Sequence, residues 1–493
     1  MQQFSNYING VFVPANNGRV FQNINPADSR DIIGEFPLSD SSDADAAVAA
    51  ASAAFHSWRL VPAPQRGNIL RRAGDIFERR KDELAAIMTR EMGKPLFETR
   101  GDIQEAIDTC YYAATEGRRL FGYNAPSEMP NKMNLSFRNP VGVCGIITAW
   151  NFPVAVPSWK IIPALVCGNT VVFKPSDDAP HSGVIFAEIL AEAGLPAGVF
   201  NVIHGNAEAG AAIVAHPDVK VIGFTGSTAT GKAIAADCGR MNKKCSLEMG
   251  GKNAQIVMED ANMELALEGV LWGAFGTTGQ RCTATSRLIL HEAIHDDFLE
   301  KLIARATALR LGNGLQSETQ VGPVINKRQL EKIENYAQIA RGEGAFCALG
   351  GERATDGDLA CGNFFKPTIF TEVTKDMRLF REEVFGPMLA VSKARDLEHA
   401  IELANYCEYG LSSSIFTANV DAAFQAIRDI EAGITYINAP TIGAEAHMPF
   451  GGIKGTGNGH REGGWTVFDI FTEWKTVYVD YSGRLQRAQI DNQ

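Results

Sequence analysis

The chain has 493 residues, more than a single ordinary domain holds, so we expect two or three units with separate cores. Its composition, 45% hydrophobic and 21% charged, is that of a folded globular protein and excludes a disordered or fibrous chain. The net charge of −11 is spread without blocks of like charge, which argues against a nucleic acid or an anionic membrane as partner and favours a small molecule.

The cysteine pattern and the N-terminus predict a cytoplasmic protein. Nine cysteines, an odd number with no CxxC pair, fit a reducing compartment better than a disulfide framework. The segment that begins Met1-Gln-Gln-Phe lacks a basic start followed by an apolar core, and no run of about 18 apolar residues occurs. We therefore expect neither a secretion signal nor a membrane span.

The first part of the chain, from about residue 42 to 121, is predicted to be helical. Asp43 can cap an alanine-rich amphipathic run, and apolar residues recur at helical spacing from Gln65 to Arg100. This part shows little catalytic chemistry.

From Val141 onward, short apolar runs alternate with helical segments. The expected strands are 141–150, 169–174, 200–204 and 219–225, with helices at 182–193 and after 230. Such alternation predicts a parallel, twisted sheet covered by helices, the usual frame for a nucleotide site at the carboxyl ends of the strands. The pattern starts again near Gly250, so we expect a second α/β domain there. Residues 122–140 and the tail 475–493 are predicted to form strands outside either core.

Two motif matches are misleading. The stretch from Gly226 to Ala233 resembles a phosphate-binding P-loop, but Ala233 replaces the hydroxyl residue that would hold magnesium. The stretch from His291 to His295 matches the zinc-protease pattern HExxH, yet the third ligand of the longer motif is missing nearby. We expect no metal site, and we interpret the second match as a solvated helix start with both histidines on one helical face.

Cys282 is the strongest single candidate for a nucleophile. It lies between Gly279 and a hydroxyl-rich stretch, which is typical of an exposed loop, and Arg281 and Arg287 nearby would favour the reactive thiolate. A buried structural thiol is the alternative, because most cysteines are of that kind.

Five further stretches surround this candidate in chain order, and together they decide between these interpretations. They place an amide, a cation with a carboxylate, a carboxylate beside two glycines, and two glycine-containing turns where ligands bind in α/β sheets. They are Thr148 to Pro153, Phe173 to Asp177, Ser246 to Asn253, Glu382 to Pro387, and Pro449 to Lys454.

In these motifs the chain resembles the aldehyde dehydrogenase superfamily over essentially its whole length. The resemblance implies an α/β fold with a Rossmann-type cofactor domain, an α/β catalytic domain and a small β oligomerisation extension. The corresponding ranges are 1–121 and 141–249 for the cofactor domain, 250–452 for the catalytic domain, and 122–140 and 470–493 for the oligomerisation strands. A homodimer or homotetramer is expected by the same resemblance.

The resemblance also implies the roles of individual residues. Cys282 would be the nucleophile, Glu248 the general base, and Asn151 with the Cys282 backbone N–H the oxyanion hole. The residues expected to hold NAD, with some use of NADP, are Thr148, Ala149, Trp150, Lys174, Ser176, Asp177, Gly226, Ser227, Glu383 and Phe385. Asp177 stands where many NAD-using relatives carry Glu, so its shorter arm leaves room for NADP.

The expected reaction is the NAD(P)-dependent oxidation of an aldehyde to the carboxylic acid. Glu248 favours hydrolysis of the thioester, whereas a CoA-acylating relative does not need that base. That relative, and a catalytically silent binding or structural member, are the alternatives. Overall resemblance to bacterial semialdehyde dehydrogenases, including those for 2-oxoglutarate and aminoadipate semialdehydes, suggests a carboxylate-bearing aldehyde. Candidate walls of its tunnel are Phe152, Trp159, Phe450, Tyr111 or Tyr112, and Arg281.

Overall fold

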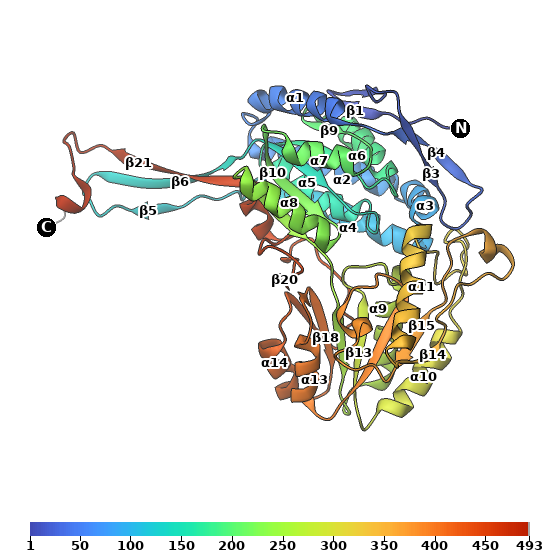
Figure 1. Cartoon of the computed structure of the whole chain (residues 1–493). Coiled ribbons are helices and arrows are strands. Elements are labelled where there is room, and N and C mark those ends of the chain that lie inside the picture. The colour runs from blue at the N-terminus through green and yellow to red at the C-terminus, as the bar shows by residue number, and fades with distance from the viewer. Residues whose placement is uncertain (492–493) are drawn as a thin grey trace.

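The computed structural model describes residues 1–491 as two α/β lobes with a narrow β arm that projects from one of them (Figure 1). Each lobe contains a seven-stranded sheet with apolar clusters on both faces. No helix within these residues is long and apolar enough to cross a bilayer. The last two residues of the predicted tail, 492 and 493, lie outside the described part.

The first sheet contains the four strands predicted from the alternating pattern and a fifth that was not predicted. The predicted four are β7 (Val143–Ile147), β8 (Thr170–Lys174), β9 (Phe200–Val202) and β10 (Val219–Thr225), and the fifth is β11 (Lys244–Glu248). These five strands are parallel and lie in the order β11-β10-β7-β8-β9. Strands β7 to β9 are buried on both faces, which explains their continuous apolar runs.

The first 40 residues form four short strands that the sequence pattern did not reveal. They are β1 (Asn6–Ile8), β2 (Val11–Val13), β3 (Val20–Ile24) and β4 (Ile32–Pro37). Strand β1 pairs antiparallel with β9 and β2 and extends the first sheet, while β3 and β4 form a separate two-stranded sheet.

The helices of the first lobe confirm the predicted helical region. They are α1 (Ser41–Trp58), α2 (Ala63–Arg79), α3 (Lys81–Met92), α4 (Leu96–Glu116), α5 (Ala155–Val166), α6 (His181–Glu192), α7 (Ala207–Ala215) and α8 (Thr228–Arg240). The predicted cap of α1 was wrong by three residues. Asp40 is the N-cap, with its carboxylate accepting from Ser42 N at 2.9 Å, while Asp43 reaches back to Asp40 N and completes a capping box.

The second sheet lies in the order β14-β15-β16-β13-β12-β18-β19, with β14 alone antiparallel to its neighbour. Its strands are β12 (Asn253–Val257), β13 (Thr285–His291), β14 (Phe346–Leu349), β15 (Thr368–Thr371), β16 (Met388–Ala394), β18 (Ser412–Phe416) and β19 (Ile434–Ile437). The helices of this lobe are α9 (Met263–Phe275), α10 (His295–Thr307), α11 (Lys327–Gly342), α12 (Arg378–Arg381), α13 (Leu397–Asn405) and α14 (Val420–Asp429).

The prediction that the two histidines of the HExxH match lie on one helical face is wrong. His291 is the last residue of β13 and His295 the first of α10, so they do not share a helical face. Among residues 1–491, no group of three or more His, Cys, Asp or Glu is arranged to hold a metal ion.

The arm consists of β5 (Asn124–Pro126), β6 (Lys132–Pro140) and β21 (Thr472–Asp480). Strands β6 and β21 pair over nine residues each, from Thr472 opposite Pro140 to Asp480 opposite Lys132. Just before the arm, the 3₁₀ turn Trp465–Asp469 returns to the first lobe, where Val467 and Phe468 join its core. A small sheet of β17 (Tyr409–Gly410) and β20 (Ile453–Lys454) lies beside this return.

Candidate active site

The carboxyl ends of β7 and β10 mark the point at which the first sheet changes direction. From β7 the chain continues to β8 and β9 on one side and later to β10 and β11 on the other. Open α/β sheets bind ligands in the crevice at such a switch point. Thr148 follows β7 and Thr225 ends β10, and neither buried hydroxyl has a hydrogen-bond partner in the described structure. Since such hydroxyls are costly when unpaired, this crevice suits a polar ligand.

The neighbouring strand β8 supplies a cation at the same edge. The Lys174 amine is buried and donates to the carbonyl of Pro175 at 2.8 Å. Burial lowers the pKa of Lys174 to about 8. Ser176 accepts from the Asp178 backbone N–H at 3.2 Å, while Asp177 is exposed. A buried cation and an exposed carboxylate therefore follow one another at the carboxyl end of β8.

The N-terminus of α8 lies beside these strand ends. Ser227 is the N-cap residue and its hydroxyl accepts from the Thr230 backbone N–H at 3.3 Å. Gly226 immediately precedes it and donates its N–H to the carbonyl of Glu248 at 3.0 Å. A helix N-terminus next to a glycine is suited to a phosphate group.

Two residues of the second lobe face the same region. Phe385 meets Trp150, which follows β7 with the half-buried Ala149, in an edge-to-face contact with ring centroids 5.5 Å apart. Phe385 has a φ of +62°, an unfavourable value for a bulky residue, and its carbonyl accepts from Gln329 at 2.8 Å. The carboxylate of Glu383 accepts from the Gly251 backbone N–H at 2.8 Å. The Trp150–Phe385 contact therefore brings one predicted cofactor residue of the first lobe against one of the second.

Cys282 lies half-buried in the loop between α9 and β13. Its carbonyl accepts from the side-chain amide of Asn253 at 2.8 Å. The expected activation by arginine is wrong. Burial, reinforced by the nearby carboxylates of Glu248 and Glu383, raises the pKa of the Cys282 thiol to about 12.

The two arginines that were expected to favour the thiolate are engaged elsewhere. Arg281 Nη2 pairs with Glu98 Oε2 at 2.6 Å. Arg287 is buried and donates to backbone carbonyls, including those of Lys252 at 2.9 Å and Ala404 at 2.8 Å. The prediction that both guanidinium groups favour the Cys282 thiolate, which rested on their proximity in sequence, therefore failed because both groups bind other partners.

Glu248 ends β11 and is 4% exposed. Neither of its carboxylate oxygens has a hydrogen-bond partner in the described structure. Burial, together with the nearby carboxylate of Glu462, raises the pKa of Glu248 well above the usual value for glutamate. A buried carboxyl group with free oxygens beside a cysteine can receive a proton from that thiol or from water.

Lys160 and Glu462 form a buried ion pair close to Glu248 that sequence reasoning missed. The sequence does indicate that Lys160 has a buried partner, because Lys160 is the only charged residue of the mainly apolar helix α5. A lysine inside such a helix requires a partner. The partner, 302 residues further along the chain, could not be identified from the sequence.

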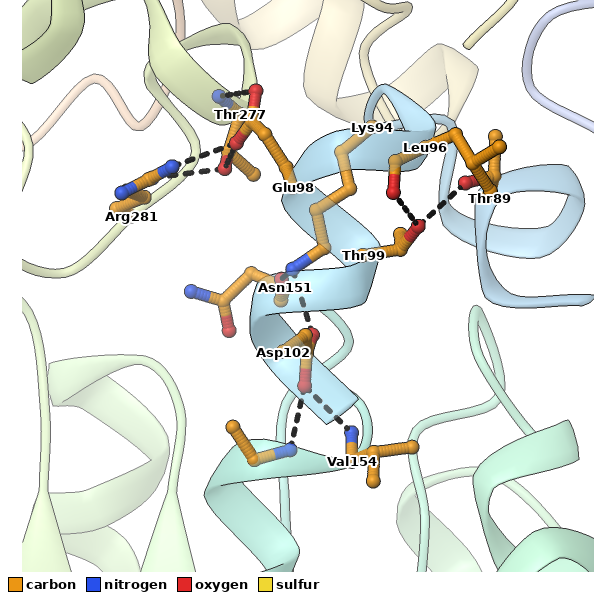
Figure 2. A network of polar contacts seen from close by, with 11 residues as sticks. Thr89, Lys94, Leu96, Glu98, Thr99, Asp102, Asn151, Val154, Thr277 and Arg281 are labelled. Carbon is orange, nitrogen blue, oxygen red and sulfur yellow. Dashed lines mark hydrogen bonds and ion pairs between the residues drawn. The ribbon is translucent and has the colours of Figure 1, made fainter. Parts of the chain in front are cut away.

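Asn151 follows β7 and is 4% exposed. Its backbone carbonyl accepts from the Lys94 amine at 2.9 Å, and Lys94 pairs with Asp102 at 2.7 Å. Figure 2 shows the Asn151 side-chain amide extending away from Lys94 and Asp102. The amide is therefore free to act as a donor to a ligand, and Lys94 and Asp102 are two further residues that sequence reasoning missed.

A cavity of about 370 Å³ lies between α4, α5 and the loop before β20. Its walls include three predicted tunnel residues, Tyr111, Tyr112 and Trp159. Trp159 packs against Phe450 with ring centroids 4.9 Å apart. The remaining lining residues are Glu105, Asp108, Ala444, Glu445, Ala446 and His447. The other three predicted walls, Phe152, Phe450 and Arg281, are not among the lining residues. The Phe152 ring instead contacts the Lys94 amine and the Arg281 guanidinium.

The comparison with known proteins identifies this arrangement. A family model described as the aldehyde dehydrogenase family matches residues 12–477. The chain belongs to the aldehyde dehydrogenase family. It is 42% identical to the alpha-ketoglutaric semialdehyde dehydrogenase of Bacillus subtilis, with 97% of this chain and 98% of that one covered. It is 40% identical to the alpha-ketoglutarate semialdehyde dehydrogenase of Haloferax volcanii, with 97% and 99% covered.

The fold agrees with solved aldehyde dehydrogenase structures. The NAD-dependent aldehyde dehydrogenase of Sinorhizobium meliloti superposes with a TM-score of 0.95 at 35% identity, with 99% of this chain and 96% of that one covered. The α/β fold class expected from the sequence motifs is thereby confirmed.

Proposed function

We propose that this aldehyde dehydrogenase uses Cys282 as nucleophile, Glu248 as general base, and the Asn151 amide with the Cys282 backbone N–H as oxyanion hole. The overall reaction is the NAD(P)-dependent oxidation of an aldehyde to its carboxylic acid. The thiolate attacks the aldehyde carbon, and the resulting oxyanion is stabilised by donors that contribute about 3 kcal/mol each in comparable sites.

The second half of the reaction needs a base. A bound NAD(P)⁺ would supply the hydride acceptor for the former aldehyde carbon, and Cys282 would be left carrying a thioester. Glu248 in its ionised form would then take a proton from a water molecule, whose oxygen attacks the thioester carbon. The C–S bond breaks, the carboxylic acid leaves, and the cysteine is regenerated.

The observation that carries this proposal is the state of Glu248. Its two oxygens have no hydrogen-bond partner among the described residues, and its raised pKa makes the ionised form a strong proton acceptor. It also lies near enough to Cys282 that, after burial, its charge is one of the causes that raise the pKa of that thiol. A CoA-acylating enzyme has no need for such a base, so hydrolysis is favoured over transfer to CoA. A catalytically silent protein would not need a free base beside a cysteine either.

The residues of the cleft fit a dinucleotide. The hydroxyls of Thr148 and Thr225, at the strand ends of the switch point, have no partner among the described residues, and the neighbouring strand β8 ends in the buried amine of Lys174. Lys174, Ser176 and Asp177 would hold the ribose, Gly226 and Ser227 the phosphates. Glu383 and Phe385, with Trp150, would hold the nicotinamide half.

The lobes and the arm have distinct proposed roles. Residues 1–121 and 141–249 would form the cofactor-binding domain and 250–452 the catalytic domain. The arm, 122–140 and 470–493, would mediate a homodimer or homotetramer. Its exposed apolar side chains support this role, because isolated apolar patches favour association. They include Tyr123, Met133, Phe137, Trp474, Tyr478, Val479 and Tyr481. The nine free cysteines suit the reducing cytoplasm.

A carboxylate-bearing semialdehyde is the proposed substrate, as the names of the two relatives suggest. The carboxyl groups that line the cavity would repel an anion if all were charged. Burial, with Asp102 nearby, raises the pKa of Glu105 to about 8. At neutral pH Glu105 is therefore mainly a neutral acid, which can donate a hydrogen bond to a substrate carboxylate.

One assay tests the reaction class. Formation of NADH or NADPH from an aldehyde is measured with and without CoA, using a panel of aliphatic, aromatic and semialdehyde substrates. We expect turnover without CoA, a free acid as product and the highest kcat/KM for a semialdehyde. A strict requirement for CoA would overturn the hydrolytic role of Glu248, and a complete lack of turnover would favour a silent protein.

A further inference from the structure

Helix α4 touches both proposed catalytic loops through two carboxylates on one of its faces. Glu98 and Asp102 are four residues apart, which places them one above the other on a helix. Their side chains are 1% and 0% exposed, so neither is a solvated surface charge. Figure 2 shows the two side chains leaving α4 toward different segments.

Glu98 binds the loop that carries the nucleophile. Its Oε1 accepts from the Thr277 backbone N–H at 3.0 Å, and its Oε2 accepts from Arg281 at 2.6 Å and from the Thr277 hydroxyl. Arg281 also donates to the Thr277 hydroxyl at 2.8 Å and directly precedes Cys282. The backbone of Thr277 and Thr278 is held at positive φ, 52° and 56°, a strained state that needs such support.

Asp102 binds the segment that carries the oxyanion donor. Its Oδ2 pairs with Lys94, and Lys94 donates to the carbonyl of Asn151 at 2.9 Å. Its Oδ1 accepts from the backbone N–H groups of Val154 at 3.3 Å and Ala155 at 2.6 Å. The segment from Asn151 to Ala155 is therefore fixed at both ends by Asp102, directly at Val154 and Ala155 and through Lys94 at Asn151.

The two sets of contacts meet at one aromatic ring. Phe152, next to Asn151, has the Lys94 amine 3.8 Å and the Arg281 guanidinium 5.5 Å from its ring centroid. Arg281 is also 4.6 Å from the ring centroid of Trp272. The proposed nucleophile and oxyanion donor, Cys282 and Asn151, lie 131 residues apart in sequence. The segments that carry them are nevertheless both held by side chains from one turn of one helix.

We infer that Glu98 and Asp102 are positioning residues that fix the Cys282 sulfur relative to the Asn151 amide. The inference rests on the proposed roles of Cys282 and Asn151. Its physical basis is that a misplacement of about 1 Å between reacting groups can cost roughly 100-fold in rate. A purely structural role, in which the carboxylates only stabilise the fold, is the competing explanation.

Two reactions of Cys282 separate these explanations without cofactor or aldehyde. 4-Nitrophenyl acetate acylates the thiolate with release of 4-nitrophenolate, and this step forms an oxyanion that needs the Asn151 amide. Iodoacetamide alkylates the same thiolate by displacement of iodide, with no oxyanion. The ratio of the acylation rate to the alkylation rate therefore reports the alignment of sulfur and amide and is independent of thiolate content.

The double variants remove each tie without leaving a buried unpaired charge. Glu98→Leu with Arg281→Met removes the first, and Asp102→Asn with Lys94→Met weakens the second. Glu98→Gln is the conservative variant, because its amide oxygen can still accept from Thr277 N. The matched control is Thr89→Val with Thr99→Val, which removes a buried 2.8 Å hydroxyl contact between α3 and α4.

We expect both double variants to lower the acylation rate about 10- to 100-fold while alkylation changes less than about threefold. Glu98→Gln should recover part of the loss, and the threonine control should keep the wild-type ratio. An unchanged ratio in folded Glu98→Gln and in either double variant would overturn the inference, as would an equal fall in the control. If the double variants do not fold, Glu98→Gln alone decides.

The same assay distinguishes failure of the inference from failure of the proposed function. Cys282→Ala should abolish the burst of acylation and the alkylation of the peptide that contains residue 282, measured by mass spectrometry because other free cysteines are partly exposed, and Asn151→Ala should lower acylation alone. If these two variants behave so while the ratio is unchanged in the α4 variants, only the positioning role is wrong. If Cys282→Ala still reacts, the proposed nucleophile is wrong.

Discussion

The side-chain amide of Asn253 donates a 2.8 Å hydrogen bond to the carbonyl of Cys282. Asn253 begins β12, five residues after Glu248, so this bond ties the segment of the proposed base to the loop of the nucleophile. Between them, Gly251 approaches the same carbonyl so closely that a Cβ there would lie 2.3 Å from it. The contact explains the glycine at 251, since a side chain there would push the two segments apart, while a Cβ at Gly250 would instead lie 2.6 Å from the Glu383 carboxylate.

Replacement of the proposed nucleophile gives the first prediction. Cys282→Ala should abolish aldehyde-dependent NADH formation while the dissociation constant for NAD⁺ stays within about threefold, because the sheet edge is untouched. Absorbance at the NADH band measures turnover, and quenching of protein fluorescence by NAD⁺ measures the dissociation constant. Cys144→Ala, Cys167→Ala and Cys245→Ala are controls that should remain active. Retained turnover in Cys282→Ala, with loss in one of the controls, would show that the assignment is wrong.

The second prediction tests the base. Glu248→Gln keeps the shape of the side chain but cannot accept a proton, and removal of a general base costs about 10²- to 10⁴-fold in the step it serves. We expect a burst of at most one equivalent of NADH per site, followed by a slow phase. Mass spectrometry of the peptide that contains Cys282 should show a trapped acyl group. Steady-state turnover equal to that of the wild type would contradict the role.

The third prediction concerns pH and the nucleophile. The pKa of the Cys282 thiol is raised to about 12, so its thiolate is rare at neutral pH and increases with pH. Alkylation of Cys282 in the unliganded enzyme by iodoacetamide, followed on its own peptide by mass spectrometry, should therefore rise about tenfold per pH unit from pH 6 to 9 without a plateau. Glutathione, a thiol with an ordinary pKa, serves as reference. A plateau below pH 8 would mean that the resting cysteine is already a thiolate.

The fourth prediction concerns the substrate carboxylate. Because the pKa of Glu105 is raised to about 8, its carboxyl group loses its proton as pH increases beyond that value. The new negative charge should raise KM for an anionic semialdehyde roughly tenfold between pH 7 and 9, or about 1.4 kcal/mol. KM for a neutral aldehyde is the control and should change little. Glu105→Gln should remove the pH dependence, and a dependence that persists in this variant would exclude Glu105 as its source.

The fifth prediction concerns the cofactor. Asp177, exposed after β8, should bond ribose hydroxyls and repel a 2′-phosphate. We expect a higher kcat/KM for NAD⁺ than for NADP⁺, with measurable NADP⁺ use because the arm is short. Asp177→Ser should shift the ratio toward NADP⁺ by roughly tenfold. A clear NADP⁺ preference of the wild type would reverse this expectation.

The sequence by itself determined much of the architecture, because the spacing of apolar residues along the chain indicates which segments form strands and helices. Apolar runs such as Thr170–Lys174 are buried on both faces, and that burial requires parallel strands with helical crossovers. The motifs around Asn151, Glu248 and Cys282 stood out because each combines reactive side chains with a strand end or a glycine turn. Local chemistry and local structure therefore indicated the family and the candidate residues before any tertiary contact was known.

Only the tertiary structure decided how those residues are held and charged. Arg281 is next to Cys282 in sequence, yet it pairs with Glu98 from a helix 183 residues earlier. Lys160 finds its partner 302 residues away in Glu462. Ion pairs and burial depend on distances in space, and the pKa of a group follows from that surrounding charge and desolvation. Sequence spacing therefore predicted an activated thiolate at Cys282, whereas the folded chain places a protonated thiol there, beside a buried base.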